Sequence, residues 1–132
     1  MSTRCNVIIK DEYDKLYFYR QEDGYPEGAM PTLKLFIDWL KDGKIRDNGV
    51  QAAGWLIILG AMEYDSIPGY ARPDYYGSPK DFKCGAYEPT TGIHGDIEFL
   101  YIIDLKAKTV GCYDEWSDEG KGLNLVEIYY NE

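Results

Sequence analysis

The sequence has one histidine, three widely spaced cysteines and no long apolar run. No stretch approaches the roughly 18 consecutive apolar residues of a membrane-spanning helix, and the opening residues MSTRC lack the apolar core of a signal peptide. Cys5, Cys84 and Cys112 are odd in number, lack CxxC spacing and stand among apolar residues. We therefore expect a cytosolic protein with buried free thiols, without disulfides and without a membrane partner.

Positive charge is also scarce. The chain carries 14 Lys and Arg against 23 Asp and Glu, a formal net charge of -9. This balance argues against a nucleic-acid polymer as partner, because such binding depends on cations along the phosphate backbone. A small anionic ligand stays compatible with it, since a few local arginines can outweigh distant acidic groups across a Debye length of roughly 8 Å.

The signatures of catalysis are missing as well. The sequence contains no GxSxG elbow, no GxxxxGK phosphate loop and no GxGxxG motif. The single histidine, His94 in GIHGD, is predicted to hydrogen-bond in a turn rather than to act as a base. Asp96 and Glu98 are predicted to share one face of a strand, but a glycosidase pair needs a defined separation that sequence does not give. We expect no enzyme, no metal and no cofactor.

The length of 132 residues, with 45% hydrophobic and 15% aromatic side chains, predicts one compact domain over positions 1–132. Apolar and polar residues alternate from Thr3 to Lys10 and from Lys15 to Arg20, which is typical of strands. The intervening DEYD has turn chemistry. The two strands are therefore predicted to form an antiparallel hairpin.

Two helices are predicted next. The first places Pro31 in its first turn, shows apolar residues from Leu33 to Leu40 at helical spacing and ends near Gly43. The second follows a cap at Asp47 or Asn48 and has only one polar residue, Gln51, between positions 50 and 62.

An all-round apolar helix needs cover on most sides, which a second copy of the chain can provide. The alternative is a central core helix of a monomer. The residues predicted to meet the second copy are Val50, Ala53, Gly54, Ile57, Ile58 and Ala61.

A long loop rich in Pro, Gly and Tyr is predicted for residues 66–80, followed by strands over 82–87, 96–105, 109–116 and 125–130. Strands and helices are thus segregated along the chain. This favours an α+β fold with a single antiparallel sheet of about six strands and two helices inserted after the first hairpin.

Arginines and aromatics are the candidates for a binding site, because guanidinium groups bind phosphate bidentately and aromatic rings stack on nucleobases. Arg20 shares the core-facing parity of Leu16 and Phe18, so it needs a partner. One interpretation is an internal ion pair with Asp23 or Glu27. The other is an anion pocket at the end of the sheet, whose candidate residues are Arg4, Arg20, Tyr25, Arg72, Tyr75, Tyr76 and Phe82.

Three stretches, MSTRCNVIIKD, YFYRQEDGYPEG and TGIHGDIEFLYIIDL, resemble small phage proteins of the Thoeris anti-defence 1 family. The resemblance implies a protein that sequesters cyclic ADP-ribose isomers such as glycocyclic ADP-ribose, made by bacterial TIR-domain sensors, in the host bacterial cytoplasm. It also implies pockets between protomers of a dimer or trimer of dimers and, in some members, a site for cyclic di- or trinucleotides. It assigns ligand contacts to Arg4, Arg20 and Tyr25, whereas Gln21 stands where the family pattern has histidine.

Two other functions stay open at this point. The acidic balance would suit an inhibitor that binds a protein of a bacterial defence system. Asp96, Glu98 and His94 would be the residues of an enzyme that degrades nucleotide signals.

Overall fold

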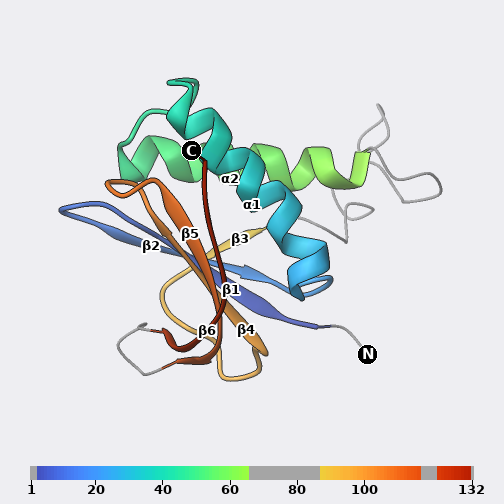
Figure 1. Cartoon of the computed structure of the whole chain (residues 1–132). Coiled ribbons are helices and arrows are strands. Elements are labelled where there is room, and N and C mark those ends of the chain that lie inside the picture. The colour runs from blue at the N-terminus through green and yellow to red at the C-terminus, as the bar shows by residue number, and fades with distance from the viewer. Residues whose placement is uncertain (1–2, 66–86, 117–121, 132) are drawn as a thin grey trace.

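The fold is a six-stranded mixed sheet with two helices on one face (Figure 1). The computed structural model describes residues 3–65, 87–116 and 122–131. Its elements, in chain order, are β1 (Cys5–Lys10), β2 (Lys15–Arg20), α1 (Pro26–Lys41), α2 (Gly49–Asp65), β3 (Glu88–Thr90), β4 (Phe99–Asp104), β5 (Thr109–Trp116) and β6 (Gly122–Tyr130). The predicted α+β class, the strand number and the insertion of both helices after the β1–β2 hairpin are confirmed.

The strand order is β3-β2-β1-β4-β5-β6. Every pair is antiparallel except β1 and β4, which run parallel with Cys5 opposite Phe99. The parallel pair arises because residues 91–98 lead the chain from the end of β3 back to the start of β1, where the Glu98 amide donates to the Arg4 carbonyl. The sheet is therefore mixed, where the sequence predicted an antiparallel one.

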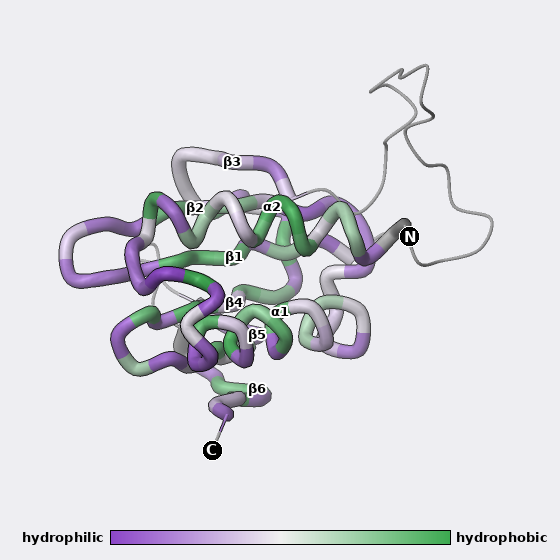
Figure 2. Tube along the Cα trace, turned by 90° about the horizontal axis from the view of Figure 1, so that it is seen from above, coloured by the Kyte–Doolittle hydropathy of each residue, from purple (hydrophilic) through white to green (hydrophobic). Residues whose placement is uncertain are grey.

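Both helices lie on the same face of the sheet. α2 packs on β1 and β2, and α1 packs on β5 and β6 (Figure 2). The main core lies between these layers and includes Val7, Phe18, Phe36, Leu56 and Tyr101. Burial of such side chains at about 1.5–3 kcal/mol each is the principal force that holds the helices on the sheet.

The opposite face, here called the open face, has a smaller apolar cluster. Ile8, Tyr19, Ile97 and Leu100 are buried there, because the segment 91–98 covers this part of the sheet. The open face thus acquires its cover from a connection rather than from a helix.

Of the four helix ends, only the start of α1 differs from the prediction. α1 begins at Pro26, so Pro31 lies inside the helix instead of in its first turn. The carbonyl that Pro31 leaves without a helical donor belongs to Glu27, whose residue is exposed to water. At its other end α1 is followed by Gly43 with φ of 79°, as the predicted stop requires. The side chain of Asn48 caps α2 by accepting the amides of Val50 and Gln51.

Two of the strand predictions differ as well. β4 begins at Phe99, so Asp96 and Glu98 precede the strand instead of sharing one of its faces. The short β3 was not predicted, and residues 82–86 of the strand predicted over 82–87 lie outside the described residues, as does the predicted loop 66–80. Within the described segments, no helix is both long and apolar enough to cross a membrane.

Candidate functional site

Arg20 is fully buried at the end of β2 and is held in an internal ion pair. Its Nη2 lies 2.7 Å and its Nη1 3.1 Å from the two carboxylate oxygens of Glu63 near the end of α2. Nη1 also donates to the hydroxyl of Tyr87 at 3.0 Å, and Nε donates to the carbonyl of Glu22. Thr32 of α1 completes the group by donating to Glu63 at 2.8 Å. The structure thus gives Arg20 a carboxylate 43 positions away in the sequence as a partner.

Arg4 and Arg20 do not share a pocket within one described chain. Cys5 is the cross-strand partner of Arg20, and both face the helices. Side chains alternate between faces along a strand, so Arg4 points to the open face. The two arginines, which were predicted from the sequence to line one anion pocket, therefore lie on opposite faces of the sheet in the structure.

Arg4 instead belongs to a group on the open face, which we call the Tyr19 cluster: Arg4, Tyr19, Thr90, His94 and Asp96. Asp96 lies 3.3 Å from Nε of Arg4 and accepts the hydroxyl of Tyr19 at 2.8 Å. The Tyr19 and His94 rings stack with centroids 3.9 Å apart and an interplanar angle of 15°. Nε2 of His94 is 2.9 Å from the hydroxyl of Thr90. Four segments of the chain converge here.

Asn6 anchors this cluster to the sheet. Its side chain is completely buried, accepts the amide of His94 at 2.8 Å and donates to the carbonyl of Phe18 at 2.7 Å. A buried amide needs such partners, because an unpaired polar group costs about 1–3 kcal/mol. The predicted turn role of His94 agrees with these hydrogen bonds.

The Tyr19 cluster has the chemistry of a binding site. Burial, and then the hydrogen bond to Asp96, raise the pKa of Tyr19, so its hydroxyl stays protonated and donates. The side chains of Arg4 and Asp96 are 43% and 52% exposed. Asp96 engages Arg4 through Nε, and the two terminal nitrogens of Arg4 have no hydrogen-bond partner among the described residues. Those nitrogens form the fork that binds phosphate bidentately.

Tyr25 lies at the same end of the sheet as Arg4. It precedes α1, is 39% exposed and makes no capping hydrogen bond with its side chain. The turn that leads to it contains Asp23 with φ of 58°, and the amide of Gly24 donates to the carbonyl of Thr3. A β-carbon at Gly24 would lie 3.0 Å from the Arg4 carbonyl carbon. Glycine is thus required for this close approach, which sets Tyr25 beside the start of β1.

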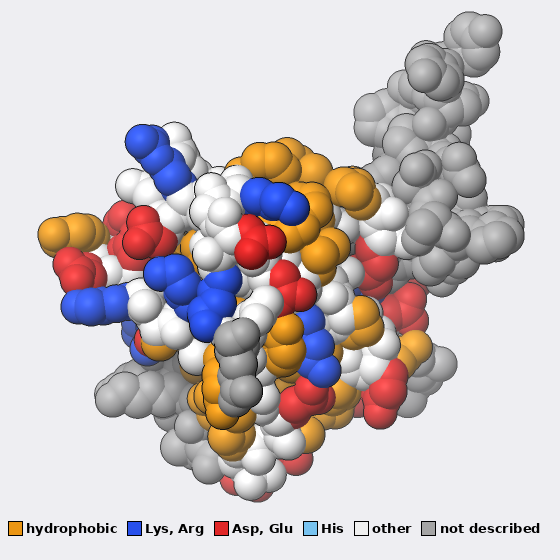
Figure 3. Space-filling view, turned by 45° about the horizontal axis from the view of Figure 1, so that its top comes forward, with side chains coloured by type: hydrophobic (Ala, Val, Ile, Leu, Met, Phe, Trp, Pro, Cys, Tyr) orange, Lys and Arg blue, Asp and Glu red, His pale blue; other side chains and the backbone are white. Residues whose placement is uncertain are grey.

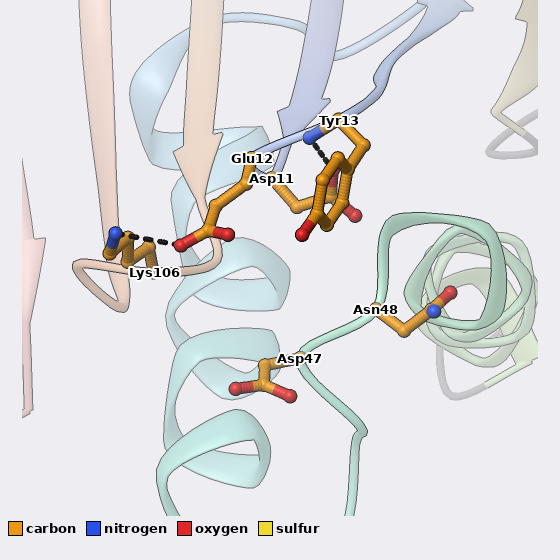
Figure 4. Close-up of a pocket in the computed structure, with 6 residues that line it drawn as sticks. All are labelled: Asp11, Glu12, Tyr13, Asp47, Asn48 and Lys106. Atoms are coloured by element: carbon orange, nitrogen blue, oxygen red, sulfur yellow. Dashed lines mark hydrogen bonds and ion pairs between the residues drawn. The ribbon is translucent and has the colours of Figure 1, made fainter.

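A surface hollow lies at the other end of β1. It measures about 260 Å³ and is lined by Asp11, Glu12, Tyr13, Asp47, Asn48 and Lys106 (Figure 4). Asp11 accepts the amides of Tyr13, Asp14 and Gly49, while Lys106 pairs with Glu12 at 2.7 Å. Three carboxylates make this hollow unsuitable for an anion. The contact of Asp11 joins the hairpin to α2, and that of Glu12 joins it to the turn between β4 and β5.

The predicted oligomer surface is partly exposed. Val50, Gly54 and Ile58 lie on the outward side of α2, where Val50 is 66% and Ile58 47% exposed, whereas Ala53, Ile57 and Ala61 are half-buried. Met62, not identified from the sequence, continues the four-residue spacing and is 52% exposed. Figure 3, which looks toward the helices, shows hydrophobic side chains gathered along this side of the molecule.

The other predicted ligand contacts, Arg72, Tyr75, Tyr76 and Phe82, lie outside the described residues, as does Cys84. Among the residues that are described, no three His, Cys, Asp or Glu side chains gather as a metal site. The role of Tyr19 was not predicted from the sequence. Its alternation with Phe18 could have placed it on the open face, but its partners Asp96 and His94 are distant in sequence.

Comparison with family models, curated proteins and solved structures finds no match to this chain.

Proposed function

We propose that this protein binds a small nucleotide signal and sequesters it without cleaving it. The observation that carries the proposal is the half-exposed Arg4, whose terminal nitrogens have no described partner, beside the stacked Tyr19 and His94 rings. A cation that can grip phosphate next to aromatic rings is the combination that nucleotide recognition uses.

The signal we propose is a cyclic ADP-ribose isomer such as glycocyclic ADP-ribose, made by bacterial TIR immune sensors. Support comes from the resemblance to the Thoeris anti-defence 1 family, because MSTRCNVIIKD contains Arg4 and TGIHGDIEFLYIIDL contains His94 and Asp96. These two stretches converge on the Tyr19 cluster. The site of action would then be the cytoplasm of the host bacterium, with cyclic di- or trinucleotides as further ligands.

Sequestration needs affinity rather than chemistry. His94 is engaged with Thr90 and Tyr19, and Asp96 with Arg4 and Tyr19, so these groups are committed to holding the cluster together. Nanomolar binding, about -12 kcal/mol, would keep a messenger below its signalling threshold.

Oligomer formation belongs to the same proposal. A dimer, or a trimer of dimers, that buries Val50, Gly54, Ile58 and Met62 would cover the exposed apolar side of α2. It would also allow a second protomer to contribute residues to the ligand site.

Calorimetric titration with a cyclic ADP-ribose isomer tests the proposal, followed by heat denaturation and mass analysis of the released ligand. Replacing Arg4 with alanine should weaken binding by about 1.5–3 kcal/mol, or roughly 10- to 150-fold. Arg46→Ala is the matched control, because Arg46 is an exposed arginine between the helices with one long contact of 3.4 Å to Gln51. The Arg4–Asp96 pair is exposed enough that its loss should cost under about 1 kcal/mol of stability.

The outcomes separate the alternatives. Tight binding with intact ligand recovered supports sequestration, whereas a chemically altered ligand would identify an enzyme. Absence of binding heat would refute the nucleotide proposal. It would leave the second candidate, a protein-binding inhibitor, which the exposed apolar side of α2 favours.

A further inference from the structure

β6 forms one edge of the sheet and is unusually long and apolar for an edge strand. It spans nine residues, and within the described chain its only strand neighbour is β5. Val126, Ile128 and Tyr130 alternate along it and are 47%, 49% and 52% exposed. Such an edge presents unpaired amides and carbonyls next to apolar side chains, which together form a template for a further strand.

The C-terminal part of β6 lacks most of the usual protections of an edge strand. The register shifts between β5 and β6 begin beyond Cys112, so Glu127 to Tyr130 pair with β5 without a bulge. β6 contains no proline, lysine or arginine, and its one charged residue, Glu127, is turned toward α1, where it pairs with Lys34 at 2.8 Å. Tyr129 faces the same way and donates to Asp38 at 2.6 Å. These contacts hold β6 firmly on the sheet, so the apolar edge is a fixed feature of the surface.

We propose that β6 pairs antiparallel with β6 of a second copy of this chain, joining two sheets across a two-fold axis at Ile128. This register places Ile128 opposite itself and Val126 opposite Tyr130 of the second copy. All three pairs on the open face are then apolar, and aromatic–β-branched pairs are favourable cross-strand neighbours. The proposal concerns a surface separate from α2 and does not rest on nucleotide binding.

Charge supports a second copy as the occupant and selects this register. Glu127 would lie opposite Tyr129 of the second copy, whereas a register centred on Glu127 would set two carboxylates against each other. The exposed side chains of β6 that would meet the second copy, Val126, Ile128 and Tyr130, are uncharged, although each chain carries a net charge of -9. Association should therefore strengthen with salt, because screening reduces the repulsion of the two chains without weakening apolar contacts.

The interface is small, one strand and three side chains from each copy, and belongs to the class that buries less than about 1,200 Å². We expect a dissociation constant on the order of micromolar. In an Ile58→Lys background, which removes the α2 contact proposed above, sedimentation velocity from roughly 1 to 200 µM should show a concentration-dependent increase in mass that Ile128→Lys removes. This range brackets the expected dissociation constant. Tyr13→Lys in the same background is the matched control, since Tyr13 is an exposed aromatic residue in the turn between β1 and β2. It should leave the β6-dependent increase intact.

Disulfide trapping tests the register. In a Cys84→Ser background, Ile128→Cys should form a covalent dimer, because opposed α-carbons of antiparallel strands lie about 4.5–5.5 Å apart, within the range a disulfide spans. Leu125→Cys is 48% exposed on the same strand, but its copies would lie about 20 Å apart and should not link. The proposal would be overturned if the two cysteine variants formed disulfide-linked dimers equally well. It would also be overturned if the protein sedimented as a monomer at every concentration, or if Ile128→Lys did not reduce the sedimenting mass.

Discussion

The buried ion pair between Arg20 and Glu63 allows a sharp test of whether Arg20 supports the fold or contacts ligand. The sequence resemblance implies a ligand contact, whereas the structure shows a guanidinium that is fully buried and bound to a carboxylate, a hydroxyl and a carbonyl. The perturbation is Glu63→Ala, which leaves the positive charge of Arg20 inside the protein without its carboxylate partner.

The expected loss is large, because removing one partner of a buried pair costs about 3–5 kcal/mol. A domain of this size has a total stability of about 5–15 kcal/mol, so about a fifth or more of it would disappear. The midpoint of thermal unfolding should fall by roughly 10–20 °C. Replacing both residues by apolar ones, Arg20→Met with Glu63→Leu, should cost less than Glu63→Ala, since no buried charge remains.

The measurement is urea unfolding of the single and double variants, together with calorimetric titration of the nucleotide. A structural role predicts loss of stability in Glu63→Ala and recovery in the double variant. If Arg20→Met kept its full stability and lost only ligand affinity, the assignment of Arg20 to the core would be wrong.

Three further predictions concern other parts of the fold. Backbone amides donate to the Asp11 carboxylate and lower its pKa below the usual 3.8. The stability that the ionised Asp11 contributes is therefore complete above pH 3.8 and is lost as pH falls through the lower folded-state pKa. Below pH 3.8, the stability of Asp11→Asn should depend less on pH than that of the wild type, as measured by acid unfolding. Gly24→Ala should lower the free energy of unfolding in urea by about 1–3 kcal/mol, because the new β-carbon would lie 2.9 Å from that of Cys5. Gly54→Ala has open space around its β-carbon and should raise the free energy of unfolding by up to about 1 kcal/mol. Equal effects of the two substitutions would contradict the packing. Burial raises the pKa of Cys5 to about 12 and that of Cys112 to about 11, so alkylation at pH 8 followed by peptide mass analysis should leave both unmodified until denaturant is added.

Predictions from the sequence succeeded where the signal is local. Alternation of apolar residues located β1 and β2, and the helical spacing from Leu33 to Leu40 located α1, because each element must turn its apolar side toward a core. The parity of Arg20 likewise indicated its burial, since residues two apart on a strand share a face.

Pairing across the chain was decided only by the tertiary structure. The parallel alignment of β1 with β4, the ion pair of Arg20 with Glu63 and the approach of Asp96 to Arg4 all join residues far apart in sequence. No local pattern encodes such partners, because they depend on how the helices and the segment 91–98 return the chain to the sheet. The sequence by itself therefore determined both helices, most of the strands and the type of candidate site residues, because these depend on local patterns. The tertiary structure decided which face of the sheet each of the two arginines occupies, because that depends on contacts between distant segments.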